Sequence, residues 1–225
     1  MKWIFLLPLL CWAAAPGRAQ TVTRAEVLEV ARSYAELKWP ATDANLRQGK
    51  DRDGVAISAP GVAAGATPPE GHWIAGATNV GMPYKWGGFD TLASFTKGAQ
   101  QGKAAGDLYN AEKRRLGGKA VSSDAVGVDC SGFISRCWKL SGKYGTSTLP
   151  DLCTSLKSVT ELKPGDILNY EGGHVILFAE WLDETHDRAR FYEAEPYSKV
   201  RASEYSAQSL ATMGFKPWRY RRIRD

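Results

Sequence analysis

The sequence VDCSGFISRCWKL, residues 128–140, predicts a helix that begins at a cysteine. Its apolar residues recur at intervals of three or four positions, which is the spacing of one helical face. They are Phe133, Ile134, Cys137, Trp138 and Leu140. A cysteine in the first turn of a helix lies where backbone N–H groups point outward and the helix dipole is positive, and both effects favour the thiolate. Cys130 is therefore the candidate nucleophile, and the same N–H groups can later stabilise an oxyanion.

A cysteine nucleophile needs a base, and the chain offers His72, His174 and His186. His174 follows two glycines and begins an apolar run, so its ring can lie at the edge of a cleft. We interpret His72 as a structural loop residue and His186 as part of a solvated polar turn. A lone histidine at the start of a strand is more often structural than catalytic. The choice of His174 as the base therefore depends on Cys130 upstream.

A third residue should orient the imidazole. The strand expected over residues 190–195 places Glu193 and Glu195 on one face, because side chains alternate along a strand. Either carboxylate could accept a hydrogen bond from His174 on the neighbouring strand. The structural alternative is a pair of glutamates exposed on an edge strand.

The pattern of the chain predicts helices first and an antiparallel sheet after them, which is an α+β architecture. Helices are expected over residues 24–38, opened by Thr23 and closed by Pro40, and over 92–100, 108–115 and 149–156. Residues 41–70 lack periodicity and are expected to form a long surface loop. Strands are expected over residues 166–170, 174–181, 189–194 and 215–223, with a tight turn at 171–173.

The first residues predict export. Lys2 precedes the apolar run 3–15, and a small residue, Ala19, ends the segment, which is the pattern of a secretory signal peptide cleaved after residue 19. The run is shorter than the roughly 20 residues of a membrane-spanning helix. We therefore expect a secreted or periplasmic protein, with an N-terminal arm over residues 20–70, a catalytic domain over 71–225 and no membrane span after cleavage.

Export affects how the cysteines are interpreted. Cys130, Cys137 and Cys153 remain after cleavage, and an odd number in an oxidising compartment suggests one disulfide and one free thiol. Cys130 and Cys137 would be separated by about 10 Å along a shared helix, too far for a disulfide. A Cys137–Cys153 bridge is the better expectation. The alternative is three reduced cysteines that pack as small apolar residues.

Composition excludes several classes of protein. The chain has 225 residues, of which 44% are hydrophobic and 24% are charged, so disorder and coiled coil are poor interpretations. Its net charge of +5 is mild and no block of Lys and Arg marks a nucleic-acid interface. Three scattered histidines offer no metal-ligand cluster, so neither a metal nor another cofactor is expected.

Four motifs in order resemble those of NlpC-type cell-wall peptidases. They are Pro83-Tyr84-Lys85-Trp86-Gly87-Gly88, Asp129-Cys130-Ser131-Gly132, Leu162-Lys163-Pro164-Gly165-Asp166-Ile167 and Gly173-His174-Val175. The resemblance covers roughly residues 76–196. Members of this family are papain-like cysteine enzymes that cut the peptide stems of peptidoglycan. The resemblance thus implies a papain-like fold, in which the nucleophile helix packs on a C-terminal antiparallel sheet.

The same resemblance assigns roles to residues. It makes Cys130 the nucleophile and His174 the base, and it places Glu193 at the third position, where the family usually has His, Asn or Gln. It also implies four substrate-binding residues, Tyr84, Trp86, Asp129 and Ser131. The free amine of the stem would be bound by Tyr84, Asp129 and Ser131. Local structural roles compete with these, since Asp129 or Ser131 could cap the helix and the segment after Lys85 could be a tight packed turn.

One departure from the family is the insertion of residues 89–127 between the Tyr-x-Trp-Gly-Gly motif at residues 84–88 and the Asp-Cys-Ser-Gly motif. We expect it to form a helical cap beside the cleft that reshapes substrate choice. The expected activity is cleavage of the γ-D-glutamyl to diamino-acid bond. The alternatives are an N-acetylmuramoyl-L-alanine amidase or an acyl or amide transferase with the same Cys-His pair, and a wall-binding module without activity.

Overall fold

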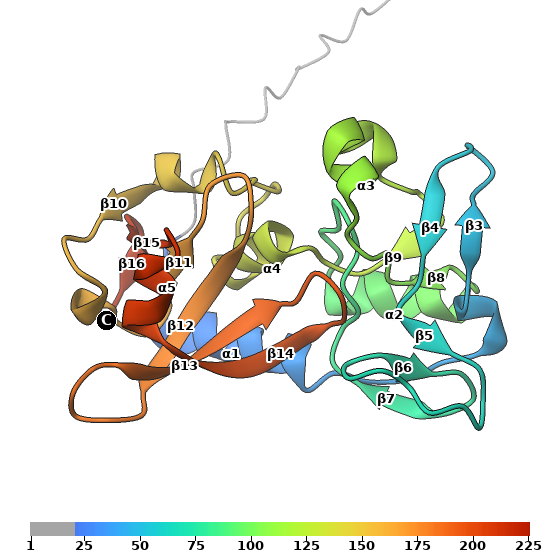
Figure 1. The fold of residues 1–225 in the computed structure, drawn as a ribbon, viewed down its shortest axis with the longest axis horizontal. Helices are drawn as coiled ribbons and strands as arrows, with labels where there is room; N and C mark the ends of the chain where they lie inside the picture. Colours follow the sequence, from blue (N-terminus) through green and yellow to red (C-terminus); the bar gives the residue numbers. More distant parts are fainter. Residues whose placement is uncertain (1–20) are drawn as a thin grey trace, which may run out of the picture.

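The structure is a computed structural model that describes residues 21–225 (Figure 1). The signal peptide expected over residues 1–19 lies outside the described residues. Within the described part, no helix combines the length and the apolar character needed to cross a membrane. Helices and an antiparallel sheet share the fold, so the predicted α+β class is confirmed.

Residues 153–220 supply the six strands of the main sheet, in the order β10-β15-β11-β12-β13-β14, with every neighbouring pair antiparallel. The strands are β10 (Cys153–Ser155), β11 (Ile167–Asn169), β12 (Val175–Trp181), β13 (Arg188–Ala194), β14 (Val200–Ser206) and β15 (Lys216–Tyr220). Because side chains alternate, Val175 and Leu177 of β12 join one apolar cluster, whereas Ile176 and Phe178 join another on the opposite face. The sheet is therefore covered on both faces.

Three helices cover the sheet. The helices α1 (Arg24–Ala35) and α4 (Cys130–Cys137) pack on the face of Val175, and α5 (Ala207–Thr212) packs on the other face. Thr23 caps helix α1 as expected, because Thr23 and Glu26 cap each other's backbone N–H groups, but the helix ends at Ala35 and not at residue 38. Seven of the eight residues of α4 are buried. This helix is thus held between α1 and the sheet.

The N-terminal half contains short paired strands, so the long loop expected over residues 41–70 is wrong. The pairs are β2 (Lys38–Pro40) with β7 (Thr78–Val80), β3 (Gln48–Lys50) with β4 (Ala56–Ser58), and β5 (Gly61–Val62) with β6 (Trp73–Ile74); a 3-10 turn covers Asp43–Asn45. A side-chain turn makes the β3–β4 hairpin, because Asp51 Oδ1 accepts from the N–H groups of Asp53 and Val55. Strands of two or three residues are too short to show periodicity.

The insertion forms helices, as expected. Helix α2 spans Leu92–Gln100, at its expected bounds, and α3 spans Ala111–Leu116, three residues later than its expected start. A 3-10 turn over Gly117–Ala120 follows, and β8 (Ala104–Ala105) pairs in parallel with β9 (Ala125–Val126). The shift of α3 follows from Asn110, whose side chain caps the helix by accepting from the N–H of Lys113.

Two expectations in the C-terminal half are wrong. Residues 149–156 form a 3-10 turn over Leu149–Leu152 and then β10, because Cys153–Ser155 pairs with β15. The strand expected over residues 215–223 divides into β15 and β16 (Ile223–Arg224), and β16 pairs in parallel with β1 (Val22–Thr23). Strand β14 and helix α5 were not predicted at all.

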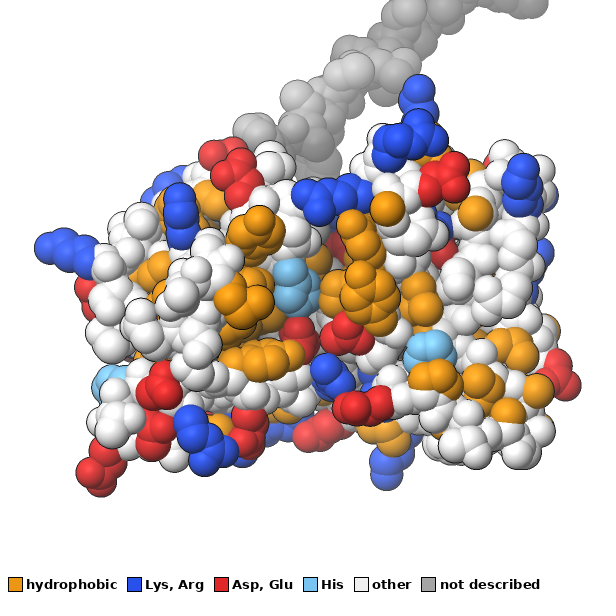
Figure 2. All heavy atoms as spheres, in the orientation of Figure 1, with side chains coloured by type: hydrophobic (Ala, Val, Ile, Leu, Met, Phe, Trp, Pro, Cys, Tyr) orange, Lys and Arg blue, Asp and Glu red, His pale blue; other side chains and the backbone are white. Residues whose placement is uncertain are grey.

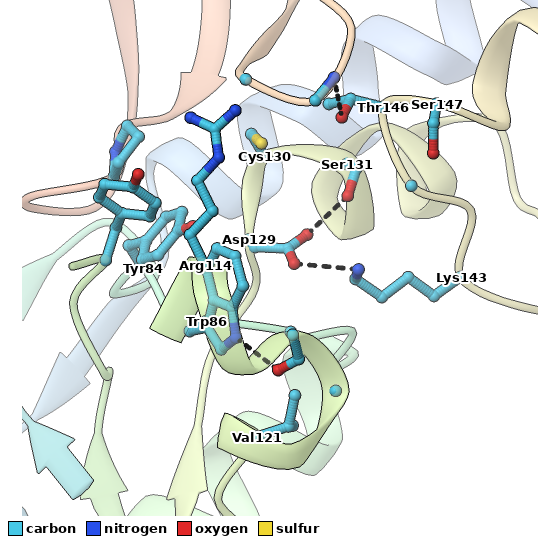
Figure 3. Close-up of a pocket in the computed structure, with 18 of the residues that line it drawn as sticks. Tyr84, Trp86, Arg114, Val121, Asp129, Cys130, Ser131, Lys143, Thr146 and Ser147 are labelled. Carbon is cyan, nitrogen blue, oxygen red and sulfur yellow. Dashed lines mark hydrogen bonds and ion pairs between the residues drawn. The ribbon is translucent and has the colours of Figure 1, made fainter. Parts of the chain in front are cut away.

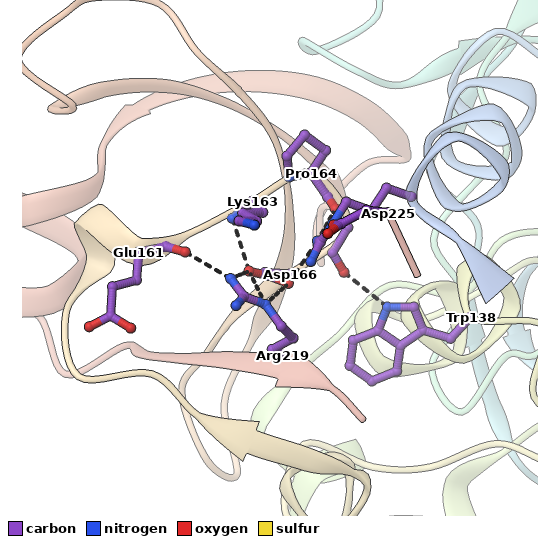
Figure 4. Close-up of polar contacts among 9 residues, drawn as sticks. Trp138, Glu161, Lys163, Pro164, Asp166, Arg219 and Asp225 are labelled. Atoms are coloured by element: carbon purple, nitrogen blue, oxygen red, sulfur yellow. Dashed lines mark hydrogen bonds and ion pairs between the residues drawn. The ribbon is translucent and has the colours of Figure 1, made fainter. Parts of the chain in front are cut away.

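A buried carboxylate joins both ends of the described chain to the sheet (Figure 4). Asp166, which has no exposed surface, accepts from Arg219 Nη2 at 2.6 Å and from Arg24 Nη1 at 3.2 Å. The N–H of Lys163 donates to the same carboxylate at 2.9 Å, and Trp138 Nε1 donates to the carbonyl of Gly165 at 3.1 Å. The Lys-Pro-Gly-Asp motif thus has a structural role, namely to fix the start of β11 against α1 and α4.

The Cys137–Cys153 disulfide expected from the sequence is absent, since Cys130, Cys137 and Cys153 are all free and buried among the described residues. The thiol of Cys153 donates instead to the carbonyl of Leu149 at 3.3 Å. The number of cysteines does not show which way their side chains point, so it could not predict a disulfide. The alternative of three buried thiols describes the structure.

Candidate active site

Cys130 is the first residue of α4 and lines a cleft of about 650 Å³. Asp129 caps the helix, because its Oδ1 accepts from the N–H of Gly132 at 2.7 Å. Only 6% of Cys130 is exposed, so its thiol is accessible through the cleft alone. The N–H of a first helical residue has no partner within the helix, which leaves that of Cys130 free to face a ligand.

Close backbone packing fixes the start of this helix. A Cβ on Gly132 would lie 2.0 Å from the carbonyl oxygen of Gly88, which no side chain can occupy. A Cβ on Gly88 would in turn lie 2.4 Å from the carbonyl oxygen of Gly127. The glycines of the Trp-Gly-Gly and Asp-Cys-Ser-Gly motifs therefore let two segments meet beneath Cys130. This agrees with the packed-turn alternative for residues 86–88.

His174 lies directly before β12, where the β11–β12 turn brings it to the same site. Its Nε2–H donates to Glu193 Oε2 on the neighbouring β13 at 2.8 Å. The other ring nitrogen, Nδ1, is buried and has no hydrogen-bond partner among residues 21–225. Since Nε2 is committed to Glu193, Nδ1 is the nitrogen left to take the proton of the Cys130 thiol.

The electrostatics of this group favour a charged imidazole. Burial opposes the positive charge, but interaction with the Cys130 thiol and the hydrogen bond to Glu193 raise the pKa of His174 to about 10. Burial likewise disfavours the carboxylate of Glu193, but its bond to His174 is the stronger effect and lowers the pKa of Glu193 to about 2. An imidazolium between a carboxylate and a thiol is the arrangement that stabilises a thiolate.

Two residues of β14 hold Glu193. Its Oε1 accepts from Ser203 Oγ at 2.6 Å and from the hydroxyl of Tyr205 at 2.7 Å, and only 3% of Glu193 is exposed. Sequence reasoning missed both donors because β14 was not predicted. The alternation of polar residues at 201, 203 and 205 was the signal for a strand that faces Glu193.

Of the two glutamates considered, only Glu193 is bonded to His174 among residues 21–225. Glu195 lies in the β13–β14 turn and accepts from the N–H of Tyr197 at 3.3 Å. The alternative of a glutamate pair exposed on an edge strand is wrong, because β13 lies inside the sheet between β12 and β14 and Glu193 is buried.

The four expected substrate-binding residues also lie at the cleft (Figure 3). Tyr84 is 2% exposed, and burial, together with the nearby Cys130, raises its pKa well above the ordinary value. Trp86 Nε1 donates to the carbonyl of Gly117 at 3.2 Å, which ties the insertion to the cleft. The hydroxyl of Ser131 donates to Asp129 Oδ1 at 3.0 Å.

Asp129 already carries a cation. Its Oδ2 forms an ion pair with Lys143 Nζ at 3.0 Å, and the side chain of Asp129 is 9% exposed (Figure 3). Sequence reasoning missed Lys143, which lies beyond the end of α4 and outside every motif. The helix-capping alternative for Asp129 describes its contacts. An incoming amine would have to displace Lys143 or share the carboxylate of Asp129 with it.

The insertion supplies part of the cleft wall. Tyr109, Arg114 and Val121 line it, and the ring of Tyr109 lies 5.7 Å from Trp86 and 6.0 Å from Tyr197 between ring centroids. Hydrophobic side chains gather near the middle of the face shown in Figure 2. The cleft thus joins an aromatic wall to the thiol.

Within the described part of the chain, no three His, Cys, Asp or Glu side chains gather in a way that could hold a metal ion. Comparison of the chain with models of protein families gave no match, and comparisons with curated proteins and with solved structures gave none either. The geometry at Cys130 is therefore the main evidence on function.

Proposed function

We propose that this chain is a papain-like cysteine peptidase that cuts peptidoglycan stem peptides at the γ-D-glutamyl to diamino-acid bond. The observation that carries the proposal is Cys130 at a helix start in the cleft, in interaction with His174, which is hydrogen-bonded to the buried Glu193. The helix α4 packed against the sheet that supplies the base supports the papain-like fold. The motif resemblance supports the substrate class.

The chemistry follows from these groups. The thiolate of Cys130 attacks the γ-carbonyl carbon, and N–H groups at the start of α4 stabilise the oxyanion. His174 donates its Nδ1 proton to the leaving amine, and an acyl-enzyme remains. Water then gives a proton to His174 and attacks the thioester, which releases the γ-glutamyl product and restores the thiolate–imidazolium pair. Glu193 keeps the imidazole oriented throughout.

The expected signal peptide supports action outside the cytoplasm, in the periplasm or as a secreted protein. The mild positive net charge of the protein is compatible with attraction to an anionic wall polymer.

The test is digestion of defined muropeptides, with products identified by mass spectrometry. We expect fragments that end in γ-D-Glu, and we expect none from Cys130→Ala, whose folding is checked by its unfolding curve. Release of the whole stem from the sugar would favour the amidase, and transfer of the acyl group to an added amine would favour the transferase. Wall degradation that is unchanged in Cys130→Ala would contradict the enzyme proposal and favour the wall-binding module.

A further inference from the structure

Arg114 extends from the insertion over the opening of the cleft. Its Nη2 lies 3.8 Å from the position that a Cβ would take at Gly172, in the turn that precedes His174. Arg114 and Cys130 line the same cleft, and in Figure 3 the side chain of Arg114 extends toward the part of the cleft where Cys130 lies. The guanidinium of Arg114 therefore lies between the insertion and the β11–β12 turn, where a bound substrate would pass.

The helix that carries Arg114 is fixed to the core by its neighbour. Lys113 Nζ donates to Asp107 Oδ2 at 2.7 Å and to the carbonyl of Ala56 at 2.6 Å. The side chains of Lys113 and Asp107 are 3% and 0% exposed. Successive helical residues point about 100° apart, so this anchor sets the direction in which Arg114 leaves α3.

The charge of Arg114 is not balanced by the protein. Among residues 21–225, its guanidinium has no ion pair or hydrogen bond, whereas the acidic groups at the cleft are paired. Asp129 pairs with Lys143, and Glu193 pairs with His174. A free cation thus faces a site where the local carboxylates are already neutralised.

A guanidinium presents a planar fork of N–H donors that matches a carboxylate. A peptide bond made through the γ-carboxyl of glutamate leaves the α-carboxylate free, at the other end of the side chain that bears the scissile carbonyl. We propose that Arg114 is a specificity-determining residue that binds this free carboxylate of the substrate. The inference rests on the proposed peptidase function. By binding the free α-carboxylate, Arg114 would let the cleft distinguish a γ-linked glutamate from a residue without that carboxylate.

Two matched substrates test it: a stem peptide with the free α-carboxylate on D-Glu, and the same peptide with an α-carboxamide. The wild type should cleave the carboxylate with about tenfold higher kcat/KM, the size expected for one charge-assisted hydrogen-bonded contact. Arg114→Gln should lose this advantage on the carboxylate and keep the wild-type rate on the carboxamide. Arg114→Lys, which keeps the charge without the fork, should fall between the two.

Arg115→Gln is the matched control, because it removes the same charge from the same helix. Arg115 pairs with Glu112 at 3.6 Å and does not line the cleft, so both rates should stay at their wild-type values. Equal cleavage of both substrates by the wild type, or an equal loss on both in Arg114→Gln, would overturn the role of Arg114 and leave the peptidase function standing. Cleavage of neither substrate would overturn the peptidase function and this inference with it.

Discussion

At the level of single residues, the carboxylate of Glu193 stabilises the positive charge on His174. Replacing Glu193 by Gln should lower the pKa of His174 from about 10, because the neutral amide cannot balance an imidazolium. The imidazolium would then be lost at lower pH, so the alkaline limb of kcat/KM should move to lower pH. At neutral pH we expect a loss of roughly tenfold to hundredfold, equivalent to about 1.4–2.7 kcal/mol.

A pH profile of kcat/KM measures this change, with Glu195→Gln as the control. Glu195 lies in the adjacent turn and is not bonded to His174, so its variant should keep the wild-type profile. A Glu193→Gln profile with an unmoved alkaline limb would contradict the assignment of Glu193 as the residue that charges and orients the base.

Tyr205 acts through Glu193 as a positioning residue. Its hydroxyl donates to Glu193 Oε1, and removing that donor in Tyr205→Phe should raise the pKa of Glu193 from about 2 toward the ordinary value of a glutamate. The carboxylate would then take up a proton at higher pH. The acid limb of kcat/KM should therefore move to higher pH by about one unit. The same shift is expected for Ser203→Ala. A uniform fall at every pH would indicate a merely structural role.

The sequence predicted the central residues of the site better than their partners. Cys130 and His174 could be named because a helix start and a strand start are visible in the local pattern. Side-chain alternation offered Glu193 and Glu195 alike, and the family resemblance favoured Glu193, which is the one bonded to His174. Lys143 and Tyr205 reach the site only through tertiary folding, so no local pattern could identify them.

At the level of elements, the start of α4 depends on the contact between Gly132 and Gly88. Gly132→Ala would place a Cβ 2.0 Å from a backbone oxygen, so the two segments must separate. We expect the free energy of unfolding to fall by about 3 kcal/mol, as for other overpacked sites, and activity to fall with the displacement of Cys130. Urea unfolding and kcat/KM measure the two effects.

Gly142→Ala is the control for this prediction, because nothing lies within 4 Å of a Cβ at Gly142. Its unfolding curve should overlay that of the wild type. Equal stability of Gly132→Ala and Gly142→Ala would show that the helix start tolerates a side chain and that the motif glycine is not needed for packing.

Element prediction succeeded where elements are long and periodic. Helix α2 and strand β12 were located closely, since each repeats its apolar pattern over at least seven residues. Strands β3 to β6 have two or three residues each, so their formation depends on turns such as the one at Asp51 and on packing. Strand β14 alternates half-buried and exposed residues over 201–205, and because polar residues occur on both faces the sequence shows little contrast between them.

At the level of the whole molecule, Asp166 holds together parts that are far apart in the sequence. Asp166→Asn would remove the carboxylate that balances Arg219 and would leave Arg24 with the exposed Asp225 as its acidic partner. We expect the free energy of unfolding to fall by about 3 kcal/mol, because breaking a buried ion pair costs more than losing an exposed one. Asp225→Asn, which removes a carboxylate that is 79% exposed and also bonded to Arg24, should change it by less than about 1 kcal/mol. Similar losses in the two variants would contradict the structural role of Asp166.

The parallel pairing of β1 with β16 means that the fold around β1 can be completed only after β16 has been synthesised. Val22 pairs with Ile223, so the partner of β1 is synthesised after all the other described elements. Until those residues have left the ribosome, β1 lacks its strand partner, and α1 is held by its packing and by the contact of Arg24 with Asp166. A chain arrested before residue 223 would therefore leave β1 unpaired, and we expect proteases to cut that chain faster than the complete fold.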